Sequence, residues 1–290
     1  MRRVIQLPDH GKLIVATDVQ GHVADFDRVA AVFEDAARDR DGAYLVVTGD
    51  LVHGPELTED EWPDYLGSFY HGDSKTVLQH ARELQERYPG RVLYLLGNHE
   101  HAHVGGPVVS KFFPDEARRL EDLLGDEGTR GMRDWLRTWP FVAVAPRARL
   151  VMLHAAPHAK IRSAEDLDRL PLDGFYDVPL EDMAARGTLG ALLWARTTST
   201  ERGYEFLRAI DAEARVAVYG HDVARSGFAV DREPLLCLST SFGCFDGDKL
   251  YLEWDLAAPA QSARDVARRG LRVLHPEAPP IHRDVHFGTY

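Results

Sequence analysis

The sequence predicts an α/β fold with largely buried strands, and two observations support this prediction. Short runs rich in Val, Leu and Ile alternate with longer segments of helical periodicity. The last four residues of each apolar run also include a residue type that binds metal ions. The runs are KLIVATD, AYLVVTGD, RVLYLLGN, RLVMLHA and VAVYGHD, which begin at residues 12, 43, 91, 149 and 216. Because ligands bind beyond the carboxyl ends of the strands in such folds, we expect these five ends to converge.

The segments between and after these runs suggest further elements. Residues 26–38 and 74–88 repeat apolar positions about every 3.6 residues, which predicts amphipathic helices. Residues 233–256, EPLLCLSTSFGCFDGDKLYLEWDL, contain two apolar runs around a Gly/Asp turn. This pattern is typical of a β-hairpin.

The length of 290 residues allows one large domain, which we expect at residues 1–258. From residue 259 the sequence is rich in proline and arginine and has little apolar periodicity. Residues 259–290 are therefore predicted to form a peripheral C-terminal tail, with a short helix at 260–269.

Charge and composition exclude several classes of protein. The formal net charge is −12, from 34 basic and 46 acidic residues, which argues against general nucleic-acid binding. No apolar run approaches membrane-spanning length, and the N-terminal apolar stretch is too short for a signal peptide. The two cysteines, Cys237 and Cys244, are compatible with a reducing compartment. We therefore expect a cytoplasmic protein.

Five polar residues end the apolar runs: Asp18, Asp50, Asn98, His154 and His221. A single Asp or His in such a place is more often a helix cap or a surface group. Five in series, with both oxygen and nitrogen donors, favour a metal centre. This donor set suits Mn, Fe or Zn, and a carboxylate can bridge two ions. The sequence thus indicates a dinuclear metal hydrolase.

The motifs TGDLV, LLGNHE, MLHAAP and YGHD follow, in this order, a strand that ends in Asp. Together they resemble the calcineurin-like metallophosphoesterases, and most closely the phosphoprotein phosphatase and diadenosine tetraphosphatase branch. The resemblance spans residues 13–256. It implies a four-layer αββα sandwich, made of two mixed sheets flanked by helices, with a dinuclear metal site at the C-terminal ends of the strands. It also implies two divalent ions, with manganese as the first choice and iron, zinc or magnesium as alternatives.

The resemblance further implies roles for individual residues. Asp18 would bind the first ion, Asp50 would bridge both, and Asn98, His154 and His221 would complete the second site. His99 would lie beside the leaving-group oxygen, as a general acid or as a stabiliser of its charge.

The first departure from the family pattern lies at the first ion. Gln20 stands where the family has a histidine, and His22 stands where many members have a glutamine. Gln20 can bind through its side-chain oxygen, although more weakly than an imidazole, and would favour harder ions such as Mn or Mg. Two alternatives stay open: His22 reaches back past Gly21, or no side chain binds at this position.

The second departure replaces the family's Asp-Arg pair with His53 and Gly54. The family aspartate orients the histidine that corresponds to His99, so without it the pKa of His99 is expected to be lower than in relatives. His53 is a candidate for substrate contact, and the alternative is a surface histidine that only fills the loop.

The family arginine of this pair grips phosphate, so its loss requires another cation. Arg196, in LLWARTTST, is the first candidate, because a guanidinium presents a fork to phosphate oxygens. The alternative is one more surface arginine. Arg186 and Arg225 are weaker candidates.

Two further segments lie close to these motifs. His101 and His103 are expected to line the rim or to face solvent. The acidic and aromatic insert at 56–73 is read either as a substrate-selecting lid or as a solvated loop.

The function that this pattern predicts is metal-dependent hydrolysis of phosphate monoesters, by in-line attack of a hydroxide that bridges the metals. The substrate would be a phosphorylated protein, nucleotide or small molecule. One alternative is a phosphodiesterase or a dinucleoside polyphosphate hydrolase. The other is a catalytically weak relative that binds phosphorylated partners.

Overall fold

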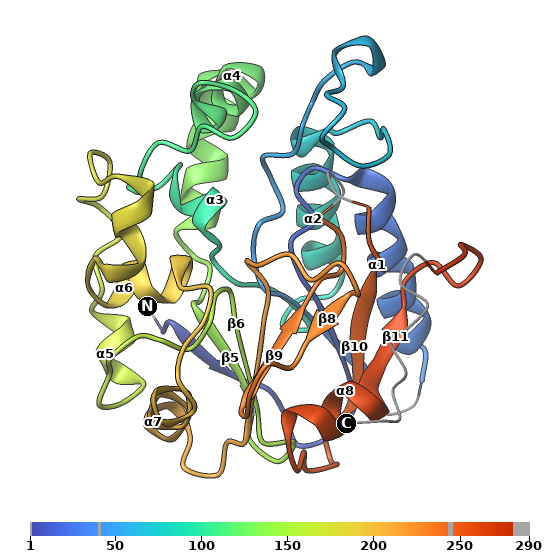
Figure 1. Ribbon diagram of the computed structural model, residues 1–290, viewed down its shortest axis with the longest axis vertical. Helices are drawn as coiled ribbons and strands as arrows, with labels where there is room; N and C mark the ends of the chain where they lie inside the picture. The colour runs from blue at the N-terminus through green and yellow to red at the C-terminus, as the bar shows by residue number, and fades with distance from the viewer. Residues whose placement is uncertain (1, 40–41, 243–245, 281–290) are drawn as a thin grey trace.

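The computed structural model describes residues 2–39, 42–242 and 246–280, and these form two mixed β-sheets packed face to face (Figure 1). Helices cover the outer faces of both sheets. This is the four-layer αββα sandwich expected from the sequence. Among the described residues, no helix has the length and apolar character needed to cross a membrane.

The first sheet has the strand order β1-β5-β6-β7-β9-β8. Its strands are β1 (Val4–Gln6), β5 (Val142–Ala145), β6 (Leu150–Leu153), β7 (Val216–Tyr219), β8 (Phe228–Ala229) and β9 (Leu235–Leu238). The pairs β6–β7 and β7–β9 are parallel, with Met152 opposite Val218 and Val218 opposite Leu236. The C-terminal ends of β6 and β7 therefore meet at one edge.

The second sheet has the order β11-β10-β2-β3-β4. Its strands are β2 (Lys12–Ala16), β3 (Ala43–Val47), β4 (Val92–Tyr94), β10 (Leu250–Asp255) and β11 (Leu271–Val273). Strands β2, β3 and β4 are parallel neighbours. Their C-terminal ends carry the remaining candidate ligands, on the same side of the molecule as those of the first sheet.

Alternate residues of each central strand face different layers. In β2, Leu13 and Val15 pack into the core between the sheets, while Ile14 packs beneath the outer helices. Met152 and Val151 divide in the same way in β6. All five of these side chains are fully buried. The strands read as continuous apolar runs because both of their faces are covered.

The helices fill the two outer layers and the rim above the strand ends. They are α1 (Val23–Ala36), α2 (Ser74–Arg87), α3 (Asn98–His101), α4 (Glu116–Leu136), α5 (Glu165–Asp168), α6 (Gly187–Trp194), α7 (Thr200–Ile210) and α8 (Ala263–Gly270), with 3₁₀ turns at Glu59–Glu61 and Leu180–Ala185. α1 packs on β2 and β3, and α7 packs on β7. The two helices expected at 26–38 and 74–88 are confirmed as α1 and α2.

The hairpin expected at 233–256 is wrong. β9 belongs to the first sheet, between β7 and β8, whereas β10 pairs with β2 and β11 in the second. All residues of β9 are buried, and the strand has a neighbour on each edge, β7 on one and β8 on the other. Neither edge is therefore free to pair with β10.

The tail expected from residue 259 is not peripheral over its first part. Helix α8 forms there, and β11 extends the second sheet antiparallel to β10. Val266 and Leu274 are fully buried. No clear sign of these buried contacts appears in the sequence, because α8 buries only one narrow face and its apolar residues alternate with polar ones. The predicted boundary at residue 258 therefore cuts through packed structure. Residues 281–290 lie outside the described part of the chain.

Candidate metal centre

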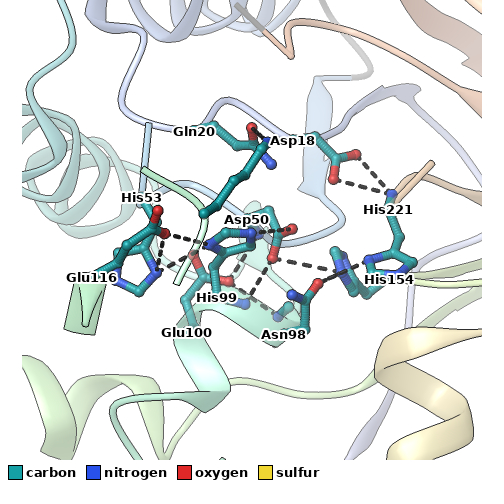
Figure 2. Close-up of polar contacts among 12 residues, drawn as sticks. Asp18, Gln20, Asp50, His53, Asn98, His99, Glu100, Glu116, His154 and His221 are labelled. Carbon is teal, nitrogen blue, oxygen red and sulfur yellow. Dashed lines mark hydrogen bonds and ion pairs between the residues drawn. The ribbon is translucent and has the colours of Figure 1, made fainter. Parts of the chain in front are cut away.

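The polar residues that end the five apolar runs come together at one edge of the two sheets, as expected (Figure 2). All of them are buried: Asp18 follows β2, Asp50 follows β3, Asn98 begins α3, His154 follows β6 and His221 follows β7. The parallel pairing of these strands is what brings residues 18 to 221 of the chain into contact.

The turns after the strands use unusual backbone conformations. Asp18, Gln20, Asp50, His53 and His221 all have positive φ angles, between 47° and 68°. Positive φ is uncommon outside glycine and costs on the order of 1–3 kcal/mol per residue. Such strain, repeated at the residues singled out from the sequence, indicates that the fold holds these side chains in place for a function.

Glycines beside the ligands allow close approach of neighbouring chains. A Cβ on Gly97 would lie 2.3 Å from Asp50 Oδ1, and one on Gly220 would lie 2.0 Å from Asp18 Oδ2. Any side chain at either position would displace a candidate ligand. This explains why the motifs GNHE and GHD each contain a glycine directly before the ligand.

Glu100 fixes the turn that carries Asp50. Its Oε2 atom accepts hydrogen bonds from the backbone N–H groups of Asp50 (2.8 Å) and Gly97 (3.1 Å), and its Oε1 atom accepts one from Leu51 (2.8 Å). The His99 N–H donates to Asp50 Oδ1 at 3.1 Å. Glu100 thus fixes the backbone of Asp50, and the His99 N–H holds its carboxylate.

The donors expected at the second ion fit a metal. His154 Nδ1 lies 2.9 Å from the Thr48 carbonyl, so it must donate there, and its Nε2 carries a lone pair. Burial lowers the pKa of His154 to about 4, which keeps the ring neutral. This Nε2 lies 2.8 Å from Asn98 Oδ1 and 3.5 Å from Asp50 Oδ1, and His221 Nδ1 lies 2.8 Å from the same Asn98 oxygen. A bare Nε2 this close to an amide oxygen is an arrangement that a cation between them would stabilise, and ligands bound at right angles with bonds of about 2.1 Å stand about 3 Å apart.

The donors expected at the first ion are less closely grouped. Both oxygens of Asp18 accept from the His221 N–H, at 3.0 and 3.1 Å. Burial and the charge of Asp50 raise the pKa of Asp18 well above its usual value, and burial raises that of Asp50 to about 7. These two buried carboxylates need positive charge to be ionised together. Gln20 Oε1 lies 3.4 Å from Lys111 Nζ, a cation that no sequence motif marks.

His22 has a structural role. Its Nδ1 accepts the Asp25 N–H at 3.2 Å and so caps helix α1. Its ring stacks on Tyr70, with 4.2 Å between the ring centroids. This geometry favours Gln20 over His22 as the side chain at the position of the family's ligand.

His99 lies beside the centre and turns one ring nitrogen towards it. Its Nε2 is 3.8 Å from Asp50 Oδ2. Burial lowers the pKa of His99 well below its usual value, and the positive charge of Lys111 adds to this. The main cause of the lowered pKa is burial rather than the missing aspartate.

His53 is not a surface residue, because its side chain is 1% exposed. Its Nδ1 lies 3.0 Å from His99 Nδ1 and its Nε2 lies 2.9 Å from His103 Nε2. Both ring nitrogens therefore contact other histidines, which leaves none for the substrate contact expected from the sequence. Glu116 Oε2 lies 3.7 Å from the Nδ1 atoms of His53 and His99, so a carboxylate is present near His99 after all.

The expectation that His101 and His103 line the rim is wrong, since both are buried. His101 Nε2 donates to the Leu172 carbonyl at 2.8 Å, and His103 Nδ1 lies 2.9 Å from Glu121 Oε1. Glu116 and Glu121 belong to α4, a helix so polar that the sequence gave no reason to connect it with His53 or His103.

Two cations lie near the centre. Arg196 donates to Asp222 Oδ1 at 2.7 Å, and its side chain is 62% exposed at the rim. Its charge lowers the pKa of both Asp50 and His221, as expected of a nearby cation. Lys111, near Gln20, has the same effect on Asp50. Lys111 lies in a loop without a recognisable motif, so no sequence signal could have identified it.

The insert at 56–73 packs against the loop that carries Gln20. The Tyr70 hydroxyl donates to the Gln20 carbonyl at 3.2 Å, and Trp62 packs edge to face on Phe69 and Tyr70. Tyr65 and Phe69 are 73% and 37% exposed. The insert thus presents aromatic surface beside the candidate centre.

Comparisons with known proteins agree with this geometry. The family model described as calcineurin-like phosphoesterase matches residues 11–225. A protein serine/threonine phosphatase from Saccharomyces cerevisiae, with similarity to human phosphatase PP5, has a similar structure: the TM-score is 0.62 at 14% identity, over 87% of this chain and 76% of that one. A cold-active protein-tyrosine phosphatase from a psychrophilic Shewanella has a TM-score of 0.53 at 16% identity, over 87% and 77%. No curated protein sequence matches significantly. At these identities the two structures show a shared fold, whereas the family model covers most of the chain, and the protein therefore belongs to the calcineurin-like phosphoesterase family.

Proposed function

We propose that the protein hydrolyses phosphate monoesters at a two-ion centre held by Asp18, Gln20, Asp50, Asn98, His154 and His221. The observation that carries this proposal is the pair of imidazole nitrogens beside Asn98 Oδ1. His154 Nε2 and His221 Nδ1 each lie 2.8 Å from this oxygen, an arrangement that a divalent cation would stabilise.

The residues suit hard to borderline divalent ions, with manganese as the first choice and iron, zinc or magnesium as alternatives. When bound, such ions supply an activated water for in-line attack on phosphorus and offset the charge of the phosphate. Glu100 holds Asp50 in the bridging position. A cytoplasmic location is proposed on composition alone.

The remaining polar groups suit the rest of the reaction. His99 turns Nε2 towards Asp50, and we assign it to the leaving-group oxygen, either as a proton donor or as a stabiliser of negative charge. Arg196 at the rim and Lys111 beside Gln20 would bind phosphate oxygens in place of the missing family arginine. Phosphorylated proteins, nucleotides and small molecules all present the group that these residues would bind.

One observation favours a second candidate, the hydrolysis of a phosphodiester or a dinucleoside polyphosphate. Tyr65 and Phe69 expose aromatic surface on the insert that packs against the Gln20 loop. Exposed rings of this kind can stack on a nucleotide base.

A substrate panel assayed with Mn²⁺ tests both candidates. We expect turnover of an aryl phosphate or a phosphopeptide that requires Mn²⁺ and disappears in Asp50→Asn. The matched control is Asp126→Asn, on the exposed face of α4, which should keep full activity. Preference for dinucleoside polyphosphates or diesters would instead support the second candidate. Absence of metal-dependent turnover on every substrate would leave the protein as a catalytically weak relative, and full activity in Asp50→Asn would exclude this centre.

A further inference from the structure

A second group of buried donors lies on the opposite side of the His99 ring from Asp50 (Figure 2). The Nδ1 atoms of His53 and His99 are 3.0 Å apart, and Glu116 Oε2 lies 3.7 Å from each. The side chains of His53, His99 and Glu116 are only 1%, 7% and 2% exposed. None of these three atoms belongs to the ligand set of the two-ion centre.

Glu116 Oε2 needs a positive partner. Its sister atom, Oε1, accepts the Phe112 N–H at 2.7 Å. Oε2 is buried and has no hydrogen-bond partner among the described residues. The distance of 3.7 Å to each histidine is too long for a hydrogen bond. A buried carboxylate oxygen without a donor is costly, so this oxygen is best explained by a ligand that the fold prepares for.

The protonation of His53 follows from the contacts behind it. Glu121 is a carboxylate paired with Arg133 at 2.8 Å, so His103 Nδ1 must donate to it. His103 Nε2 is then the acceptor that remains on this ring, and we assign the proton of the 2.9 Å contact to His53 Nε2. His53 therefore carries its proton on Nε2. Its Nδ1 presents a lone pair towards Glu116 Oε2.

We propose that His53 Nδ1, His99 Nδ1 and Glu116 Oε2 bind a third divalent ion, separate from the two-ion centre. Two imidazoles and one carboxylate form a common ligand set for zinc, in sites that leave one position open. Donors bonded tetrahedrally to zinc at about 2.0–2.1 Å stand about 3.3–3.4 Å apart, and the three observed separations bracket this value. His53 is bonded to His103, and His103 is bonded to Glu121. Hydrogen bonds of this kind, behind the ligand, orient metal-binding histidines.

The third ion would decide which nitrogen of His99 carries the proton. Without the ion, His99 must donate from Nδ1 to the lone pair of His53 Nδ1, which leaves Nε2 bare. With the ion on Nδ1, the proton moves to Nε2, the atom that lies 3.8 Å from Asp50 Oδ2. A neutral His99 could then donate to a leaving group. This consequence rests on the proposed phosphatase activity, but the existence of the site does not.

Metal counting tests the site directly. The full chain is reconstituted with Zn²⁺, freed of unbound metal by gel filtration and analysed for zinc per chain. Glu116→Gln keeps the bond to Phe112 but loses the anionic ligand, and we expect it to hold one zinc fewer than the wild type. Glu86→Gln, on the exposed face of α2, is the matched control and should hold as many as the wild type. Equal zinc in Glu116→Gln and wild type would overturn the proposal and leave a hydrogen bond between His53 and His99.

Anomalous diffraction at the zinc edge keeps the proposal testable if Glu116→Gln fails to fold. Wild-type crystals grown with Zn²⁺ should show a peak about 2 Å from the three donor atoms. Peaks at Asn98 and Asp50 without one here would overturn the proposal. The outcomes for the proposed function are separate, because His154→Asn should lose zinc at the two-ion centre and keep it at this site. A wild type that binds the third ion but hydrolyses no phosphate ester would refute the function alone.

Discussion

Replacing Glu100 by Gln should loosen the turn that carries Asp50. The Glu100 carboxylate accepts three buried N–H groups, from Asp50, Gly97 and Leu51. A glutamine has one oxygen, which can replace Oε2 and keep the bonds to Asp50 and Gly97. Its NH₂ group then faces the Leu51 N–H, two donors with no acceptor between them.

The magnitude follows from these three bonds. The unsatisfied Leu51 N–H costs about 1–3 kcal/mol. The two bonds that remain lose their charge assistance, which makes each about half as strong. Removing the Glu100 charge also relieves its repulsion of Asp50, which offsets part of the loss. We expect the free energy of unfolding to fall by about 2–4 kcal/mol, a large part of the 5–15 kcal/mol typical of a domain.

Urea unfolding of the metal-free protein at pH 8.5 measures this change, because Glu100, with its pKa raised to about 7 by burial, is ionised there. Glu86→Gln on the exposed face of α2 is the control and should stay within about 0.5 kcal/mol of wild type. Calorimetric titration with Mn²⁺ should also show a loss of affinity of about 10–100-fold, as for other residues that orient a ligand. A loss of stability below about 1 kcal/mol with unchanged Mn²⁺ affinity would refute the role of Glu100.

Three further changes test other parts of the molecule. Gln20→His should tighten Mn²⁺ binding at the first site by about tenfold in calorimetric titration, and unchanged affinity in a folded variant would count against Gln20 as a ligand. Arg196→Ala should raise KM for an aryl phosphate by about tenfold with little change in kcat, whereas an unaltered KM would make Arg196 a plain surface residue. His275→Asn should destabilise the protein more at pH 6 than at pH 9 in urea unfolding: the hydrogen bond to Asp25 raises the pKa of His275 above 6.5, so the stabilisation is complete below pH 6.5 and is lost as pH rises through the folded-state pKa. An equal effect at both pH values would contradict this.

The main strands and the first ligand set could be predicted because their signals are local. Each apolar run forms a strand, and the residue after it faces the edge where ligands gather. Asp18, Asp50 and His154 could therefore be placed in one centre without knowing the contacts between them. Because both faces of such a strand are buried, it appears in the sequence as a continuous run of apolar residues, which is easy to recognise.

The partners of the strands could not be predicted in the same way. β9 and β10 are close in sequence, and the Gly/Asp turn between them is a local signal for a hairpin. The neighbours that each strand acquires, β7 for one and β2 for the other, come from distant parts of the chain. Pairing with distant strands therefore outweighed the local turn signal, because β9 is paired on both edges within the first sheet.

Contacts between distant segments also account for the residues that the sequence did not reveal. Glu116 and Glu121 lie on a helix of mixed charges, where acidic residues are usually solvated. Lys111 lies in a loop before that helix. Nothing within a few residues of these positions marks them, because their roles depend on His53, His103 and Gln20, which lie between 18 and 91 residues away from their partners.

The departure at position 53 and the acidic residue at 116 are best understood together. The family aspartate at position 53 would orient His99, and its replacement by His53 suggested that His99 had lost a carboxylate partner. Glu116 from α4 supplies a carboxylate 3.7 Å from His99 Nδ1, and His53 supplies a lone pair 3.0 Å from the same atom. Two neutral imidazoles beside one buried carboxylate form a ligand set with a single negative charge, whereas an aspartate in place of His53 would add a second one. His53 in place of the family aspartate therefore exchanges a negatively charged partner of His99 for an imidazole that would serve as a ligand in the proposed third site.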